Sequence, residues 1–155
     1  MKTRIATILL CTLLAGVAVQ AADSGPVSTQ PGAGERIKLA RDAIQAKDWK
    51  KALAELNMAV RDEPRNADIH NLLGYSYRKQ ASPDLAKAFE HYKTAIRLDP
   101  RHKGAHEYIG EAYLMDKKPA EAHKHLATLA QICGNTTCEE YADLAKSIAD
   151  YKARN

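Results

Sequence analysis

The sequence predicts an all-α fold: an α-solenoid of three helix-turn-helix units followed by a C-terminal capping helix. The first reason is an internal period, because Ala40, Gly74 and Gly110 are spaced by 34 and 36 residues. The second is that helix-forming residues are abundant, while no segment alternates in the manner of a β-strand. A further set of small residues follows at one position of each copy: Ala52, Ala88 and Ala122.

The first unit resolves into two helices with readable ends. We expect these helices at about 35–46 and 49–61, and the second of them follows Asp48, a residue type that caps helix starts. Asn66 is the expected cap of the next helix, which opens the second unit with a broad apolar surface.

The later units carry similar start and stop signals. Ser82-Pro83 is typical of a helix start, with Ser as the cap and Pro in the first turn, where its missing N–H costs nothing. Two extra residues near this point should lengthen the inner turn of the second unit. In the third unit we expect one helix over 102–115 and another that opens at Pro119 and ends at Gly134, which tolerates the left-handed turn.

A seventh helix is expected over the last residues, about 137–153. Thr137 and Glu140 fit a capping box, in which Thr caps the helix and a Glu three residues later bonds back. Lys and Asp residues decorate the face away from Leu144 and Ile148, as expected for a helix that seals the end of a stack.

The small residues have a packing role. Gly74 and Gly110 are expected to face bulky side chains of the partner helix, because a larger residue there would force two close helices apart. This pattern resembles the tetratricopeptide repeat (TPR) family over about 33–133, roughly two thirds of the chain. The residues that carry the resemblance lie in the second copy and, more weakly, the third: Leu73, Gly74, Tyr77, Ala88, Tyr92, Ala95, Asp99 and Pro100, then Ile109, Gly110, Tyr113, Ala122 and Leu126.

The resemblance implies a module that holds peptides or other proteins on a concave surface lined by the first helix of each unit. Tyr75, Arg78 and Lys79 form a cluster suited to an acidic peptide or a carboxylate; alternatively, the two cations are a solvated helix end placed favourably against the helix dipole. By analogy of position, the partner-binding residues are Arg41, Asn71, Tyr75, Arg78, Lys79, Glu107 and Glu111. Where one subset of the family clamps a chaperone carboxylate, this chain has Ile37, Arg41, Leu72, Gly104 and Tyr108, so the clamp is absent.

The first residues indicate export. A basic start, an apolar run over 5–19 and small residues before Ala22 predict a signal peptide over 1–21, and the run is short for an uncleaved anchor, which needs roughly 20 residues. We therefore expect a periplasmic or secreted protein with no stable membrane span after cleavage. A flexible linker over 22–34 precedes the TPR domain, 35–153. Its repeats are expected at about 33–66, 67–102 and 103–136.

Composition excludes several classes of function. Cleavage removes Lys2 and Arg4, which lowers the Lys and Arg total from 23 to 21 against 19 acidic residues and the net charge from +4 to +2. No basic stripe with interleaved aromatic residues is present, so nucleic acid is a poor partner. No nucleophile with a base, phosphate-binding glycine loop or acidic metal cluster appears, so we expect neither an enzyme nor a cofactor.

Two cysteines and the histidines leave an alternative function open. Cys133 and Cys138 flank a helix–turn–helix corner within disulfide reach, which in an oxidising compartment favours a structural bridge. The alternative is a redox pair, because Cys138 lies in the first turn of its helix. His123 and His125 diverge by roughly 200° on a helix, so surface or inter-helix roles are favoured over a metal site. The competing hypothesis is thus a metal- or redox-handling accessory protein.

Overall fold

The computed structural model describes residues 30–155, and within that range it has seven helices and no strand. The expected signal peptide and most of the expected linker lie outside the described residues. No helix in the described range combines the length and apolarity that a membrane span requires. The helices are α1 (Ala33–Gln45), α2 (Trp49–Asp62), α3 (Ala67–Lys79), α4 (Leu85–Leu98), α5 (Lys103–Met115), α6 (Pro119–Cys133) and α7 (Glu139–Arg154).

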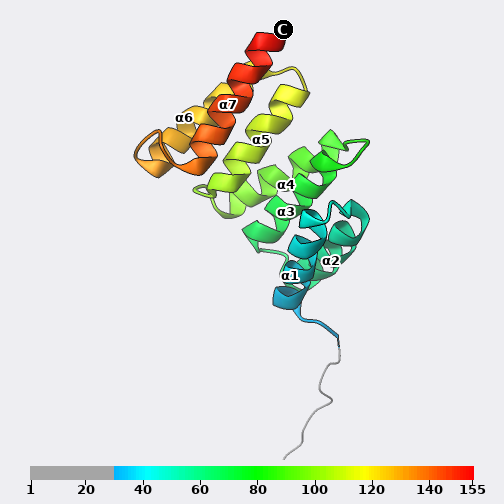
Figure 1. Ribbon diagram of the computed structural model, residues 1–155. Coiled ribbons are helices and arrows are strands. Elements are labelled where there is room, and N and C mark those ends of the chain that lie inside the picture. Colours follow the sequence, from blue (N-terminus) through cyan, green and yellow to red (C-terminus); the bar gives the residue numbers. More distant parts are fainter. Residues whose placement is uncertain (1–29) are drawn as a thin grey trace, which may run out of the picture.

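The helices stack in pairs along the molecule (Figure 1). The pairs α1–α2, α3–α4 and α5–α6 each pack together, and neighbouring pairs join through α2 with α3 and α4 with α5. The last helix, α7, packs on α5 and α6 at the end opposite α1. This arrangement confirms the predicted α-solenoid of three helix pairs closed by a capping helix.

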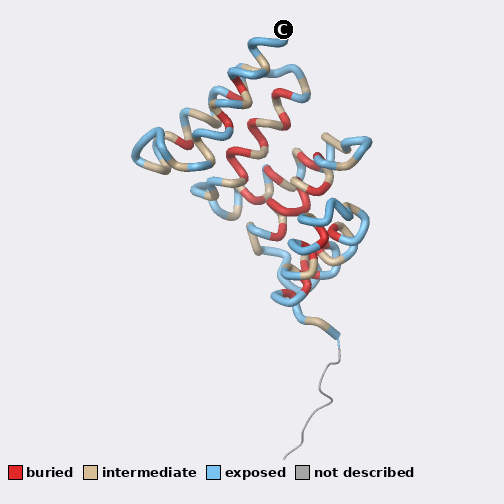
Figure 2. The backbone as a smooth tube through the Cα atoms, viewed as in Figure 1, coloured by how far each residue is buried: buried red, intermediate tan, exposed pale blue. Residues whose placement is uncertain are grey.

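The buried residues lie where helices face one another (Figure 2), and they divide into three apolar clusters. One cluster joins α1 and α2 to α3, the next joins α4 to α5, and the last joins α5 and α6 to α7. Each cluster therefore crosses a boundary between consecutive units. A single helix pair cannot bury its apolar residues alone, so the stack is the stabilising unit.

One backbone hydrogen bond recurs in all three inner turns, where the residue before the second helix donates its N–H to a carbonyl of the first. The pairs are Asp48 to Ala43 at 2.8 Å, Asp84 to Tyr77 at 3.1 Å, and Lys118 to Tyr113 at 2.8 Å. The middle turn spans 80–84, whereas the others span 46–48 and 116–118. The two extra residues of the second unit thus lengthen its inner turn, as predicted.

Several predicted helix ends are confirmed. The Asp48 carboxylate accepts the N–H of Lys51 at the start of α2, and the Asn66 side chain accepts two N–H groups at the start of α3. Pro119 opens α6, and Gly134 closes it with φ at 70°, in the left-handed region. These signals are local, so the sequence alone is enough to identify them.

The prediction that α4 starts at Ser82-Pro83 is wrong. Asp84 is the cap, because its side chain accepts the N–H of Lys87 at 3.0 Å. The backbone bond that closes the inner turn fixes Asp84 as the last non-helical residue. Because the Asp84 carboxylate caps the helix, Ser82, two residues upstream, does not.

The predicted capping box at Thr137 is also wrong. The N–H and the hydroxyl of Thr137 both donate to the Asn135 side chain, at 2.9 and 3.0 Å, so the threonine belongs to the turn. Helix α7 instead begins at Glu139, with Cys138 as its N-cap and no side-chain cap bond. The turn and the Cys133–Cys138 bond together decide where this helix starts.

The expected linker is shorter at its C-terminal end than predicted. Helix α1 begins at Ala33, and the Gly32 carbonyl accepts the N–H of Arg36 at 3.0 Å. Ala33 is buried in the first apolar cluster, which explains why this residue is helical and not part of a tether.

Gly74 and Gly110 are close-packed in different ways. A Cβ atom at Gly74 would lie 2.6 Å from the Tyr92 ring of the partner helix α4, as predicted. A Cβ atom at Gly110 would instead lie 2.6 Å from Leu144 of α7. The capping helix, and not the partner α6, takes up the space that this glycine leaves, because α7 packs directly against α5.

Candidate partner-binding surface

The first helix of each unit contributes to one surface, which we call the inner face: the surface formed by α1, α3, α5 and α7. Helices α3, α5 and α7 pack in succession, and α1 shares a hollow with α3 and α5. All predicted binding residues lie on the helices of this face. They are Arg41 on α1, Asn71, Tyr75, Arg78 and Lys79 on α3, and Glu107 and Glu111 on α5.

Arg78 is the buried centre of the inner face, with 6% of its surface exposed. Its guanidinium pairs with the Glu111 carboxylate at 2.5 Å, and its Nε donates to the Tyr92 hydroxyl at 3.3 Å. The guanidinium carbon lies 5.5 Å and 5.6 Å from the ring centroids of Tyr75 and Tyr108. A cation is stable in such a site because it is paired, hydrogen-bonded and flanked by aromatic rings.

The alternative in which Arg78 is a solvated helix end is therefore wrong. The residue is not a solvated helix end, and its charge is already matched by Glu111. The exposed cations of this part of the face are Lys79, whose Nζ lies 5.8 Å from the Tyr75 ring centroid, and Arg41.

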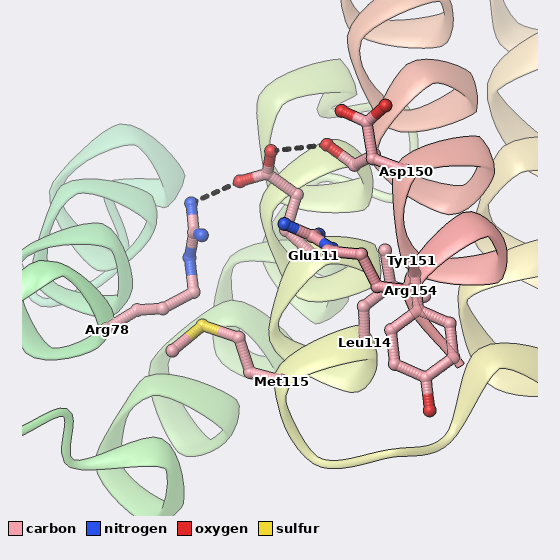
Figure 3. A pocket seen from close by; sticks show the side chains of 8 residues that line it. Arg78, Glu111, Leu114, Met115, Asp150, Tyr151 and Arg154 are labelled. Carbon is pink, nitrogen blue, oxygen red and sulfur yellow. Dashed lines mark hydrogen bonds and ion pairs between the residues drawn. The ribbon is translucent and has the colours of Figure 1, made fainter.

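Glu111 connects three helices of the inner face. One carboxylate oxygen pairs with Arg78 of α3, and the other accepts the Ser147 hydroxyl of α7 at 3.1 Å (Figure 3). The chain of contacts from α3 through α5 to α7 holds the capping helix in register with the repeats. Side chains held in this way present a preorganised surface.

The part of the face near α7 is acidic. Burial, followed by the carboxylates of Glu111, Asp143 and Glu140, raises the pKa of Glu107 to about 8. Burial and then Glu107 raise the pKa of Tyr108 to about 12. Glu107 therefore takes up a proton more readily than an exposed glutamate does.

Asn71 lies beneath the face and not on it, with 7% of its surface exposed. Within residues 30–155, its side-chain oxygen has no hydrogen-bond partner. A Cβ atom at Gly104 would lie 3.2 Å from the Asn71 side-chain nitrogen, so Asn71 fills the junction of α3 and α5. Asn71, like Arg78, is thus almost fully shielded from contact with a partner.

Two hollows flank the aromatic cluster around Arg78. Small-molecule sites usually enclose about 300–1,000 Å³, so hollows below that range suit single side chains of a bound chain better than a whole ligand. The first encloses about 230 Å³ and is lined by Arg41, Ile44, Gln45, Leu72, Tyr75 and Tyr108. The second encloses about 260 Å³ and is lined by Arg78, Glu111, Leu114, Met115, Ser147, Asp150, Tyr151 and Arg154 (Figure 3).

The family model of the tetratricopeptide repeat matches residues 37–101 and 84–134, which together make up more than half of the chain. The chain belongs to the tetratricopeptide repeat family. Among curated proteins, no sequence matches this TPR protein.

Solved TPR domains share its fold. The first TPR of Spaghetti (RPAP3), bound to an HSP90 peptide, is 16% identical with a TM-score of 0.67, over 78% of this chain and 93% of that one. The TPR2B domain of yeast Sti1, in a complex with pHsp70, is 15% identical with a TM-score of 0.70, over 79% and 98% of the two chains. At identities this low, the structural likeness shows a common fold and nothing more.

The cysteines of this TPR protein lie away from the inner-face hollows. Cys133 and Cys138 are joined by a disulfide bond across the α6–α7 turn. In the described part of the chain, these two cysteines and Glu140 are the one group of three potential metal ligands. Sulfur atoms bonded to each other offer no thiolate, so this group is a poor metal site as it stands.

Four of the histidines form two pairs that the sequence analysis did not predict. The Nδ1 atoms of His70 and His91 lie 3.1 Å apart, and those of His106 and His125 lie 2.9 Å apart. The signal was present in the sequence, because both partners recur with the repeat period. His102 has a separate role: it caps α5 through the N–H of Ala105.

Proposed function

We propose that this chain is an exported TPR adaptor that binds an extended segment of a partner protein along the inner face. The observation that carries the proposal is the pair of side-chain-sized hollows on either side of the Tyr75–Arg78–Tyr108 cluster. Aromatic residues and arginine are typical of the residues that dominate binding energy at protein interfaces. We expect no catalytic activity.

The charges suggest what the segment looks like. Near the first hollow the exposed cations are Arg41 and Lys79, while Arg78 is neutralised. We therefore propose an apolar side chain in the first hollow with an acidic residue beside it. The acidic surroundings of Glu107 disfavour a carboxylate farther toward α7.

The two similar TPR domains give a contrast. They are seen with an HSP90 peptide and with pHsp70. The sequence positions at which the chaperone clamp is expected hold Ile37, Leu72, Gly104 and Tyr108 here, with Arg41 as the one cation. We propose that this protein uses the same face for a different peptide.

Export rests on the signal-peptide pattern over 1–21 and is consistent with a disulfide bond, since such bonds persist in oxidising compartments. The mass of the protein recovered from the producing cell's envelope and medium tests this part. Cleavage after Ala21 is the expected result. An unprocessed chain found with the cytoplasm would contradict export while leaving the binding proposal intact.

A photo-crosslinking experiment tests the binding surface. A photoreactive residue is placed at Gln45 in the first hollow, at Met115 in the second, and at Lys124 on α6 as the control. Gln45 and Met115 should label the same partner, and the double variant Arg41→Glu/Lys79→Glu should weaken that labelling at least tenfold. Labelling from Lys124 as strong as from the two hollows would refute the proposal.

The alternative, a redox or metal-handling accessory, makes a different demand on the cysteines. If the adaptor proposal is correct, Cys133→Ala with Cys138→Ala lowers thermal stability and leaves crosslinking unchanged. A pair that cycles at mild potential, and whose loss abolishes activity while the fold persists, would favour the accessory role instead.

A further inference from the structure

Each unit has one polar pair that joins its first helix to its second, away from the inner-face hollows. In the first unit this pair is an ordinary ion pair, whereas in the second and third it consists of two histidines. The pairs and their separations are Arg36–Glu55 at 3.0 Å, His70–His91 at 3.1 Å and His106–His125 at 2.9 Å. The two histidine pairs do not line the hollows on which the proposed function rests.

The first-helix histidines have a fixed tautomer. The Nε2 of His70 lies 3.0 Å from the Pro64 carbonyl, and the Nε2 of His106 lies 3.1 Å from the Pro100 carbonyl. A carbonyl only accepts, so each Nε2 carries the proton and a neutral ring has its lone pair on Nδ1. Donation of one ring N–H to a carbonyl is the arrangement that orients metal-ligating histidines.

The second-helix histidines are held by stacking. The His91 ring stacks on Tyr77 with 5.6 Å between centroids and 4° between planes, and the His125 ring stacks on Tyr113 with 5.7 Å and 18°. Both Nδ1 atoms of each pair therefore face one another before any ion arrives. An ion at about 2.0–2.1 Å from both atoms lies beside the line that joins them, so each ring tilts to bind it, but two imidazoles already held this close lose little freedom in doing so.

The separations suit adjacent ligand positions on one metal ion. At a metal–nitrogen distance of about 2.0–2.1 Å, two ligands at a right angle are about 2.9 Å apart, and two tetrahedral ligands are about 3.4 Å apart. The observed 3.1 and 2.9 Å lie at the right-angle end of that range. Tetragonal coordination by nitrogen is typical of Cu²⁺, which also binds most tightly among the first-row divalent ions.

We propose that His70–His91 and His106–His125 are two separate bidentate imidazole sites for a divalent transition-metal ion, with Cu²⁺ bound more tightly than Zn²⁺. On binding, the proton shared between the two Nδ1 atoms moves to the Nε2 of the second-helix ring, so neutral pairs release no net proton. Glu121 lies on α6 with His125, but its carboxylate already accepts a hydrogen bond from Lys124 at 2.7 Å. Water supplies the remaining coordination positions, which predicts readily exchangeable ions.

The remaining two histidines provide a matched control. Both ring nitrogens of His102 are engaged, one by the N–H of Ala105 and the other by the Asp68 carboxylate at 3.0 Å. His123 is exposed on α6 and is not part of either pair. His102→Asn keeps a capping side chain, and His123→Gln removes an exposed imidazole, so this double variant tests whether any histidine suffices.

The full chain, without a histidine tag, is titrated with CuCl₂ and separately with ZnCl₂ by calorimetry, and Cu²⁺ coordination is read by electron paramagnetic resonance. Two Cu²⁺ per chain with nitrogen hyperfine coupling are expected. His91→Phe and His125→Phe, which keep a ring against the tyrosine, should each lower the count to one and together weaken binding at least 100-fold. Circular dichroism checks the fold, and His91→Asn with His125→Asn replaces any phenylalanine variant that unfolds.

His102→Asn/His123→Gln should retain two ions. An unchanged count in His91→Phe/His125→Phe, or a lower count in the His102 and His123 control, would overturn the proposal. So would a wild-type chain that binds neither ion tighter than millimolar. In that case the pairs are only hydrogen-bonded links between helices, as Arg36–Glu55 is.

Discussion

Replacing Gly74 by Ala perturbs the closest approach between α3 and α4. The new Cβ atom would lie 2.6, 2.7 and 3.0 Å from Cε1, Cδ1 and Cγ of Tyr92, whose side chain is fully buried. Because Cγ lies next to the Tyr92 backbone, rotation of the ring cannot relieve all three contacts. Overpacking of this kind costs about 1–3 kcal/mol, and the helix preference of Ala over Gly returns about 1 kcal/mol. We expect a net loss of about 0–2 kcal/mol in unfolding free energy.

Urea unfolding followed by circular dichroism measures this loss. Gly34→Ala is the control, because a Cβ atom there meets nothing within 4 Å, and it should be neutral or stabilising by up to about 1 kcal/mol. Tyr92→Leu removes the clashing ring, and the third unit has a leucine, Leu126, in that place. Gly74→Ala in the Tyr92→Leu background should cost less than in the wild type. A stabilising Gly74→Ala, or strict additivity, would refute the reasoning.

Three further predictions concern single interactions. Glu111→Gln leaves buried Arg78 without its counter-charge and should lower the unfolding free energy in urea by about 2–4 kcal/mol, part of which Arg78→Met restores; a loss below about 0.5 kcal/mol would contradict a buried pair. The pKa of Glu107 is raised from 4.5 to about 8 in the folded protein, so folding favours the protonated side chain. The contribution of this group to the unfolding free energy is therefore full below pH 4.5 and is lost as pH rises through 8. At 1.4 kcal/mol per unit this loss is at most on the order of 5 kcal/mol, and thermal melts at pH 5 and 9 should show it in the wild type and not in Glu107→Gln. Cys133→Ala/Cys138→Ala should lower the unfolding free energy by about 2 kcal/mol in denaturant, and no change would mean that the short loop constrains little.

Some helix ends could be predicted because their signals are local. Asp48, Asn66 and Gly134 act through backbone groups a few residues away. The failure at Ser82 occurred where a second capping residue, Asp84, stands close by, and the failure at Thr137 occurred where the side chain bonds within the preceding turn. A backbone bond from Asp84 to the preceding helix decided the first case and the turn around Asn135 decided the second, and neither contact is visible in local sequence.

The sequence predicted on which helices the candidate residues lie, but not the surroundings of their charges. The repeat period places the binding residues on the first helices, and the structure has them there. The repeat period could not reveal that Glu111 neutralises Arg78, because Glu111 belongs to the next repeat. The sequence favoured surface or inter-helix roles for the histidines but did not reveal which of them pair, because pairing depends on how neighbouring helices pack.

The sequence by itself determined that this protein is a stack of helix pairs, because period, small residues and caps are properties of short segments. It also predicts that the family's chaperone clamp is absent, since the residues at the corresponding positions are of the wrong kind. Only the tertiary structure decided which charges remain available on the inner face, which glycine meets the capping helix, and which histidines face each other. Those outcomes depend on distances between helices, and burial then decides whether a charge, a cavity or a lone pair is free for a partner.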